Sequence, residues 1–258
     1  MQPARLAGID FLNALPLLAG LGPPEVVVEL MRPAEAADRL AAGSVDGALL
    51  PVAELLRIPG LAVVDGLAIA ACGAVDSVLV VSRGAVKAAG RLYLDPASRT
   101  SNLLAQLVLP RLGATRAEIT ALPAPARLEA GEARVIIGDA ALGGDWRGLE
   151  ILDLGSGWQQ LTGLPFVFAV WALAARAQTP AVAQALRAAA ARGLASIDTI
   201  ALDQGPRRGI PGELARSYLR TRVRYTLGGE ERQALALFAR MCVDAGLVAS
   251  PVPEFTWM

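Results

Sequence analysis

Five consecutive polar residues stand where a helix is predicted to begin, and they could bind an anion. Apolar residues at positions 103, 104, 107 and 108 predict the helix, and Ser98, Arg99, Thr100, Ser101 and Asn102 precede them. The free N–H groups and the positive end of a helix favour a carboxylate or a phosphate at such a place. Two simpler interpretations stay open: Ser98 or Thr100 caps the helix, and Arg99 is solvated at the surface.

Other candidate residues fall at predicted strand ends. Asn13 lies in the loop after the first strand, where it either turns the chain or binds a ligand, and Ser77 precedes an apolar strand as a ligand contact or a satisfied buried hydroxyl. Gly138 and Asp139 form a predicted strand-to-helix turn in which Asp139 could simply be a cap. Phe166 is either a core aromatic or a platform for a ligand.

The elements that must position these residues alternate between strands and helices, which predicts the α/β class. Helices follow one another in the last third of the chain. The predicted strands are 4–9, 26–30, 45–50, 67–71, 77–82, 91–94, 134–137, 150–154 and 166–173. The predicted helices are 33–42, 53–57, 180–197, 212–220 and 230–245.

The strand-like runs 77–82 and 166–173 bracket a middle block that has its own strands and helices. A chain that leaves one lobe and later returns to it gives this pattern. We therefore expect a discontinuous first lobe of residues 1–82 and 172–258, and a second lobe of residues 83–171. Ligands of open α/β sheets bind beyond the carboxyl ends of strands, which predicts a ligand cleft between the lobes.

Composition excludes several classes of protein. The 258 residues carry 24 basic and 24 acidic side chains, so nucleic acid is not an expected partner. The absence of His removes Ser-His-Asp and Cys-His catalysis and imidazole metal ligands. Cys72 and Cys242 lie far apart in the sequence and form no metal or redox motif. Neither a metal site nor a phosphate-binding or dinucleotide-binding motif is expected.

No uncharged apolar run reaches the length of about 18 to 20 residues that a spanning helix needs. The short apolar run from Phe11 to Leu21 follows Arg5 but is interrupted by polar residues and by Pro16, so we interpret it as mature structure rather than as a signal peptide. A cytoplasmic protein without a membrane partner is expected.

Several segments together resemble one family. They are Phe11-Leu12-Asn13-Ala14-Leu15-Pro16, the stretch from Cys72 to Val78, Ser98-Arg99-Thr100-Ser101, Ile137-Gly138-Asp139-Ala140-Ala141-Leu142, and Thr162-Gly163-Leu164-Pro165-Phe166-Val167-Phe168-Ala169. In these segments the sequence resembles chorismate dehydratase, the first enzyme of the futalosine route to menaquinone, over essentially its whole length. The resemblance implies a two-lobe, type II periplasmic-binding-protein-like fold with chorismate in the cleft.

The resemblance also implies a lyase reaction without a cofactor, in which chorismate loses water to give 3-[(1-carboxyvinyl)oxy]benzoate. Asn13 and Ser77 are the implied catalytic residues. Asn13 would orient or polarise the departing hydroxyl, while Ser77, Thr100 and Ser101 would hold carboxylates. The implied proton acceptor is the enolpyruvyl carboxylate of the substrate, with Asp139 as the alternative base.

Three other interpretations are weighed against this one. 1,4-Dihydroxy-6-naphthoate synthase has the same fold, but its family relies on a catalytic His, which this chain lacks. A non-catalytic receptor for a small carboxylate would carry an export signal or a lipoprotein Cys near the start. A transcription-factor effector domain would need a helix-turn-helix segment, and the predicted strand at residue 4 leaves no room for it. The oligomeric state stays open.

Overall fold

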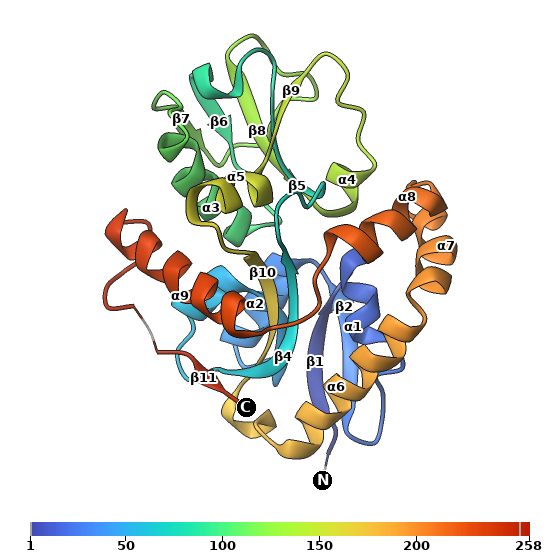
Figure 1. The fold of residues 1–258 in the computed structure, drawn as a ribbon. Helices are drawn as coiled ribbons and strands as arrows, with labels where there is room; N and C mark the ends of the chain where they lie inside the picture. Colours follow the sequence, from blue (N-terminus) through green and yellow to red (C-terminus); the bar gives the residue numbers. More distant parts are fainter. Residues whose placement is uncertain (1, 253) are drawn as a thin grey trace.

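Two lobes, each built on its own sheet, make up the molecule (Figure 1). The computed structural model describes residues 2–252 and 254–258. The first lobe holds a six-stranded sheet of order β11-β4-β10-β3-β1-β2, in which β1 runs parallel to β2 and β3 while β10 runs antiparallel to β3 and β4. Its strands are β1 (Ala4–Ile9), β2 (Val26–Met31), β3 (Gly47–Pro51), β4 (Ala62–Ala71), β10 (Phe166–Leu173) and β11 (Thr256–Trp257).

Helices of the first lobe cover this sheet: α2 packs against β1 and β3, α6 against β4, and α9 against β10. Their bounds are η1 (Leu12–Ala14), α1 (Leu15–Leu18), α2 (Pro33–Ala41), η2 (Val52–Leu56), η4 (Ala175–Ala177), α6 (Pro180–Ala195), α7 (Ile197–Arg207), α8 (Gly212–Ser217), the π-helical turn η5 (Tyr218–Arg222) and α9 (Gly229–Asp244).

The second lobe is a five-stranded sheet of order β7-β6-β8-β5-β9. Its helix α3 packs against α5 and β8, and α4 follows β8 directly. The elements are β5 (Val78–Ser82), η3 (Val86–Ala88), β6 (Arg91–Tyr93), α3 (Arg99–Arg111), β7 (Glu118–Thr120), β8 (Glu132–Ile137), α4 (Gly138–Leu142), β9 (Glu150–Asp153) and α5 (Leu154–Thr162).

The predicted two-lobe α/β architecture is confirmed, but the predicted boundaries place two strands in the wrong lobe. β5 pairs with β8 and β9 in the second sheet, whereas β10 pairs with β3 and β4 in the first. The chain therefore crosses between the sheets through residues 72–77 and 163–165, before β5 and before β10. Both strands are almost wholly buried apolar runs, and such runs do not reveal from sequence which sheet they join.

One carboxylate organises the first crossing. Asp153, at the end of β9, accepts the backbone N–H groups of Val75 and Asp76 at 3.0 and 2.7 Å on one oxygen. Its other oxygen caps α5 by accepting the N–H of Ser156 at 3.0 Å. Burial raises the pKa of Asp153, and these three N–H groups oppose that rise. The crossing segment is thereby fixed to the second lobe just before Ser77.

An aromatic cluster joins the second crossing to the core of the first lobe. Trp158 of α5, Phe166 of β10 and Phe238 of α9 are each at most 1% exposed, with edge-to-face ring centroids 5.1 to 6.2 Å apart. The Trp158 indole N–H donates to the carbonyl of Pro165 at 3.0 Å, so its one polar group is satisfied. Such pairs add about 0.5–1.5 kcal/mol beyond the area that they bury.

Close packing of α1 against α6 generates a first prediction. A Cβ on Gly193 of α6 would overlap the carbonyl oxygen and backbone of Pro16. We expect Gly193→Ala to force the two helices apart and to lower the free energy of unfolding by about 1–3 kcal/mol. Urea denaturation followed by circular dichroism measures this change.

Gly229→Ala is the matched control, because a Cβ there meets nothing within 4 Å and the residue lies in the first turn of α9. It is expected to leave stability unchanged or to raise it by up to about 1 kcal/mol. Equal stability of the two variants would contradict the packing argument.

Candidate active site

A small cavity of about 60 Å³ lies between the lobes, at the carboxyl ends of β1, β3 and β8. Its polar lining is Asn13, Ser77, Ser98, Thr100 and Ser101, and aromatic side chains Phe11 and Phe168 are among its apolar lining. None of the residues that line it carries a charge. Together with Gly138, six of the predicted site residues are thus brought together, although they are up to 125 positions apart in the sequence.

The start of α3 presents three hydroxyl groups, each of which already accepts one hydrogen bond. Ser98 is the N-cap: its Oγ accepts the N–H of Ser101 at 3.1 Å and donates to Ser101 Oγ at 2.8 Å. Thr100 Oγ1 accepts the N–H of Ala53 at 3.1 Å from the opposite lobe. A hydroxyl has one proton, so Thr100 and Ser101 keep their O–H groups for donation into the cavity.

Tyr218, which the sequence interpretation did not single out, joins the two predicted catalytic residues. The Asn13 amide donates from Nδ2 to the Tyr218 hydroxyl at 2.9 Å, and Ser77 Oγ lies 2.8 Å from the same hydroxyl. Burial raises the pKa of the Tyr218 phenol above its ordinary value, against the opposing hydrogen bonds from Ser77 and Asn13. Tyr218 has no motif around it, and only the folding of the C-terminal third brings it here.

Asp139 does not line the cavity but connects the lobes beside it. Its carboxylate accepts the N–H of Leu12 at 2.9 Å and pairs with Arg208 at 3.4 Å, while Arg208 also pairs with Asp10 at 2.8 Å. Burial raises the pKa of Asp139, and the Leu12 N–H and the Arg208 charge oppose that rise. Both carboxylate oxygens of Asp139 thus bind groups of the first lobe, and we call this set of contacts between the lobes the latch. The structure shows no side-chain capping bond at the start of α4, so the prediction that Asp139 is a helix cap is not supported.

Gly138 brings the two lobes into close contact at the cavity wall. It has a φ of +65°, and a Cβ there would lie 3.0 Å from the ring of Phe11. A left-handed backbone and an aromatic ring against the α-carbon both favour glycine. Gly138 therefore contributes only backbone atoms to the lining of the cavity.

Arg99, Asn102 and Phe166 do not reach the cavity. Arg99 forms ion pairs across the cleft with Asp38 at 2.7 Å and with Glu54 at 3.2 Å. Its guanidinium is therefore engaged by carboxylates, and it neither points into the cavity nor lies unpaired in solvent. Asn102 instead closes the loop before α3 by bonding both backbone groups of Asp95. Phe166 packs against Trp158, which supports its interpretation as a core aromatic residue. Phe168, two residues further along β10, lines the cavity instead.

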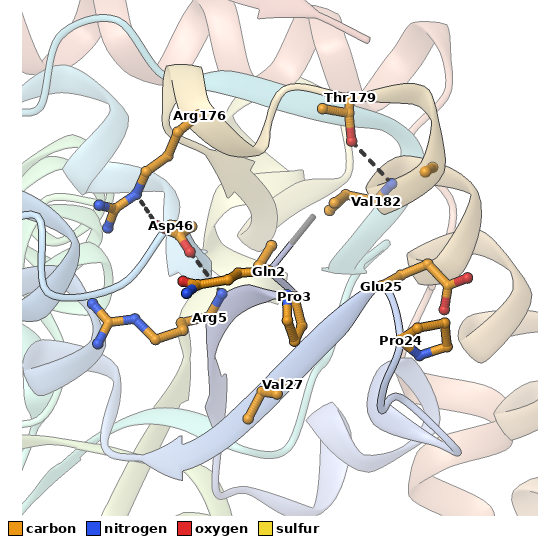
Figure 2. Close-up of a pocket in the computed structure, with 12 residues that line it drawn as sticks. Gln2, Pro3, Arg5, Pro24, Glu25, Val27, Asp46, Arg176, Thr179 and Val182 are labelled. Carbon is orange, nitrogen blue, oxygen red and sulfur yellow. Dashed lines mark hydrogen bonds and ion pairs between the residues drawn. The ribbon is translucent and has the colours of Figure 1, made fainter.

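A wider hollow of about 850 Å³ lies at the opposite, amino-terminal end of β1 (Figure 2). Two of its charged side chains pair with each other: Asp46 contacts the Arg176 guanidinium and also accepts the backbone N–H of Arg5 at 2.7 Å. Ligands of open α/β sheets bind at the carboxyl ends of strands. The inner cavity is therefore the candidate site despite its smaller volume.

Comparison with known proteins identifies the family. A family model described as menaquinone biosynthesis matches residues 4–244. The chain belongs to this menaquinone biosynthesis family. Chorismate dehydratase from Thermus thermophilus is 31% identical to it over 197 residues, which cover 69% of this chain and 72% of that protein. The sequence resemblance to chorismate dehydratases is thus confirmed.

Solved structures with the same fold include a protein from Archaeoglobus fulgidus, with a TM-score of 0.75 and 15% identity over 96% of this chain and 99% of that chain. The periplasmic aliphatic sulphonate binding protein SsuA from Escherichia coli has a TM-score of 0.65 and 16% identity over 100% of this chain and 94% of its own. At these identities the similarity shows the fold alone. It confirms the predicted periplasmic-binding-protein-like fold for this member of the menaquinone biosynthesis family.

Within the described residues, no helix is both long and apolar enough to cross a membrane. Nor does the part of the chain that the structure describes bring together three or more Cys, Asp or Glu side chains that could hold a metal ion.

The latch generates a second prediction. Asp139→Ala removes the acceptor of the Leu12 N–H and one partner of Arg208, so it weakens the closed arrangement by about 1–3 kcal/mol. We expect faster proteolysis of the crossing segments and a larger radius of gyration in X-ray scattering.

Asp145→Ala is the control, because Asp145 pairs with the nearby Arg147 within the second lobe and not across the cleft. A latch role for Asp139 is wrong if both variants scatter like the unmodified protein.

Proposed function

We propose that this protein is a chorismate dehydratase, a lyase that converts chorismate to 3-[(1-carboxyvinyl)oxy]benzoate and water in the futalosine pathway of menaquinone biosynthesis. The observation that carries the proposal is the uncharged cavity in which Thr100 and Ser101 offer O–H donors opposite Asn13. Family membership and the similarity to a chorismate dehydratase support it.

The reaction requires little from protein acids and bases. A proton leaves the ring carbon that bears the enolpyruvyl ether, the hydroxyl leaves the neighbouring carbon, and the electron pair of the broken C–H bond completes an aromatic ring. Proton and hydroxyl together make the released water. The aromatic product supplies much of the driving force, so positioning of the substrate is the main contribution expected from the protein.

Carboxylate recognition is assigned to uncharged donors. Chorismate has two carboxylates, and Thr100 and Ser101 lie in the first turn of the 13-residue helix α3, where the helix dipole adds a positive potential. Ser77 is assigned to a carboxylate as well, from the side of the crossing segment. Charge-assisted hydrogen bonds of this kind are roughly twice as strong as neutral ones.

Proton removal is assigned to the substrate itself. No Asp, Glu or Lys side chain lines the cavity among the described residues, and the Asp139 carboxylate is held by Leu12 and Arg208 outside it. The enolpyruvyl carboxylate of chorismate is then the base nearest to the reacting carbon. Asn13 is assigned to the departing hydroxyl, which an amide N–H stabilises as negative charge develops on its oxygen.

Substrate entry requires opening of the cleft. Small-molecule sites usually enclose roughly 300–1,000 Å³, and the cavity of about 60 Å³ is smaller than that. The lobes therefore separate to admit chorismate and close around it, which excludes water from the reacting atoms.

Incubation of the purified protein with chorismate tests the assignment. We expect the aromatic enol ether to form, as followed by chromatography and mass spectrometry, and Asn13→Ala to lower kcat by about 100-fold or more because a donor to the leaving group is lost. Thermal stabilisation by chorismate without turnover would favour a binding protein of the same fold. Full turnover by Asn13→Asp would contradict the role of Asn13.

Ser101→Ala tests the carboxylate contact. Loss of a hydrogen bond to a charged group costs about 1.5–3 kcal/mol, which corresponds to roughly 10- to 100-fold in kcat/KM. Ser82→Ala is the matched control: Ser82 is also buried in the second lobe, and its hydroxyl donates to the carbonyl of Glu132 at 3.0 Å. Steady-state kinetics should separate the two variants, and equal kcat/KM values would remove Ser101 from the site.

A further inference from the structure

The two hydrogen bonds of the Tyr218 hydroxyl can be assigned a donor and an acceptor. Tyr218 is 2% exposed, and within the described residues its hydroxyl bonds to Asn13 and Ser77. Asn13 Nδ2 donates, so it occupies an acceptor position of the phenol oxygen. A buried O–H left without an acceptor is costly, and Ser77 Oγ is the acceptor within reach at 2.8 Å. The phenol proton therefore goes to Ser77.

This arrangement determines what the two cavity residues offer a ligand. Ser77 Oγ accepts from Tyr218, so its own proton is left for the cavity, as at Thr100 and Ser101. The Asn13 amide has one N–H bound to Tyr218, which leaves the second N–H and Oδ1 for a ligand. One phenol thus sets the hydroxyl direction of Ser77 and the amide orientation of Asn13.

The backbone around Tyr218 is held to the same part of the fold. Tyr218 opens the π-helical turn η5, where the N–H of Val223 bonds to the carbonyl of Tyr218 at 3.2 Å. Beyond the turn, Arg224 exchanges two backbone hydrogen bonds with Ala70 of β4, at 2.7 and 2.9 Å. Single π-turns within helices often mark functional positions.

The same turn also contacts the crossing segment. Arg222 Nε donates to the Asp76 carboxylate at 2.7 Å, next to Ser77. Asp76 has a φ of +60°, a left-handed backbone that the surrounding contacts must hold in place. Tyr218 and Arg222 together fix residues 76 and 77, just where the chain enters the second lobe.

We propose that Tyr218 is a positioning residue for the dehydration: its phenol fixes the Asn13 amide toward the departing hydroxyl and directs the Ser77 proton to a substrate carboxylate. The inference rests on the proposed function. Tyr218 is not among the residues that line the cavity, so it acts through Asn13 and Ser77 and not by contact with substrate.

Tyr218→Phe tests the inference, because it keeps the ring and removes only the hydroxyl. With chorismate as substrate we expect kcat to fall about 10- to 100-fold and KM to change by less than about threefold, since the oriented Asn13 amide acts in the transition state. Tyr225→Phe is the matched control. Tyr225 is 6% exposed on the same segment, and within the described residues its hydroxyl has no hydrogen-bond partner, so its removal leaves the kinetics unchanged.

A double-mutant comparison distinguishes positioning from general stability. In an Asn13→Ala background Tyr218→Phe is expected to lower kcat by a smaller factor than in the unmodified protein, because one of the two groups through which it acts is gone and only Ser77 remains. Additive losses, or a loss in Tyr218→Phe that a lower folded fraction explains entirely, would overturn the inference.

A readout that does not need turnover separates this inference from the proposed function. The Asn13 side-chain amide signals, assigned in a proton–nitrogen spectrum by their absence in Asn13→Ala, are expected to shift in Tyr218→Phe and not in Tyr225→Phe. If the unmodified protein fails to convert chorismate but these signals shift, the proposed reaction is wrong and the positioning by Tyr218 is retained. Unshifted signals overturn the positioning whatever the substrate.

Discussion

The connection between the two sheets depends on the Asp153 carboxylate. It accepts three backbone N–H groups, two from the first crossing segment and one from the start of α5. Without it these donors would be left without partners in a largely buried place, at a cost of about 1–3 kcal/mol each. Because Val75 and Ser77 of the same segment line the cavity, this side chain helps to set the position of one wall of the site.

The cavity combines neutral donors in a way that suits an anion with delocalised charge. An arginine inside would bind carboxylates more strongly, but it would also stabilise the ground state of a substrate whose own carboxylate must take a proton. Interactions that are equal in ground and transition states do not raise kcat. In the proposed function, hydroxyl donors would hold the carboxylates and leave their basicity less affected. The proposed substrate-assisted proton transfer therefore accords with a lining that lacks charge.

Elements with strong local patterns were predictable from sequence, whereas the contacts between them were not. β1 was predicted with its observed bounds, and the polar run correctly located the start of α3, where Ser98, one of the two predicted cap residues, is the N-cap. The assignment of β5 and β10 to sheets failed, because buried strands look alike in sequence. The predicted helix 212–220 divides into α8 and the π-turn, and α7 was not predicted. Tyr218 was missed because its partners lie 205 and 141 residues away in the sequence.

Charged side chains lie around the cavity and none is part of its lining. Arg208 joins Asp10 and Asp139 on one flank, and Arg99 joins Asp38 and Glu54 on another. The pairs Arg208–Asp139, Arg99–Asp38 and Arg99–Glu54 connect the first lobe to the second, whereas Arg208 and Asp10 both belong to the first lobe. Apart from the buried Glu54, these side chains are in contact with solvent, and ion pairs of that kind contribute modestly. In the proposed function, the cavity between the lobes would exclude water and lower the local dielectric, so the few hydrogen bonds from Ser77, Thr100 and Ser101 would act more strongly on a bound anion.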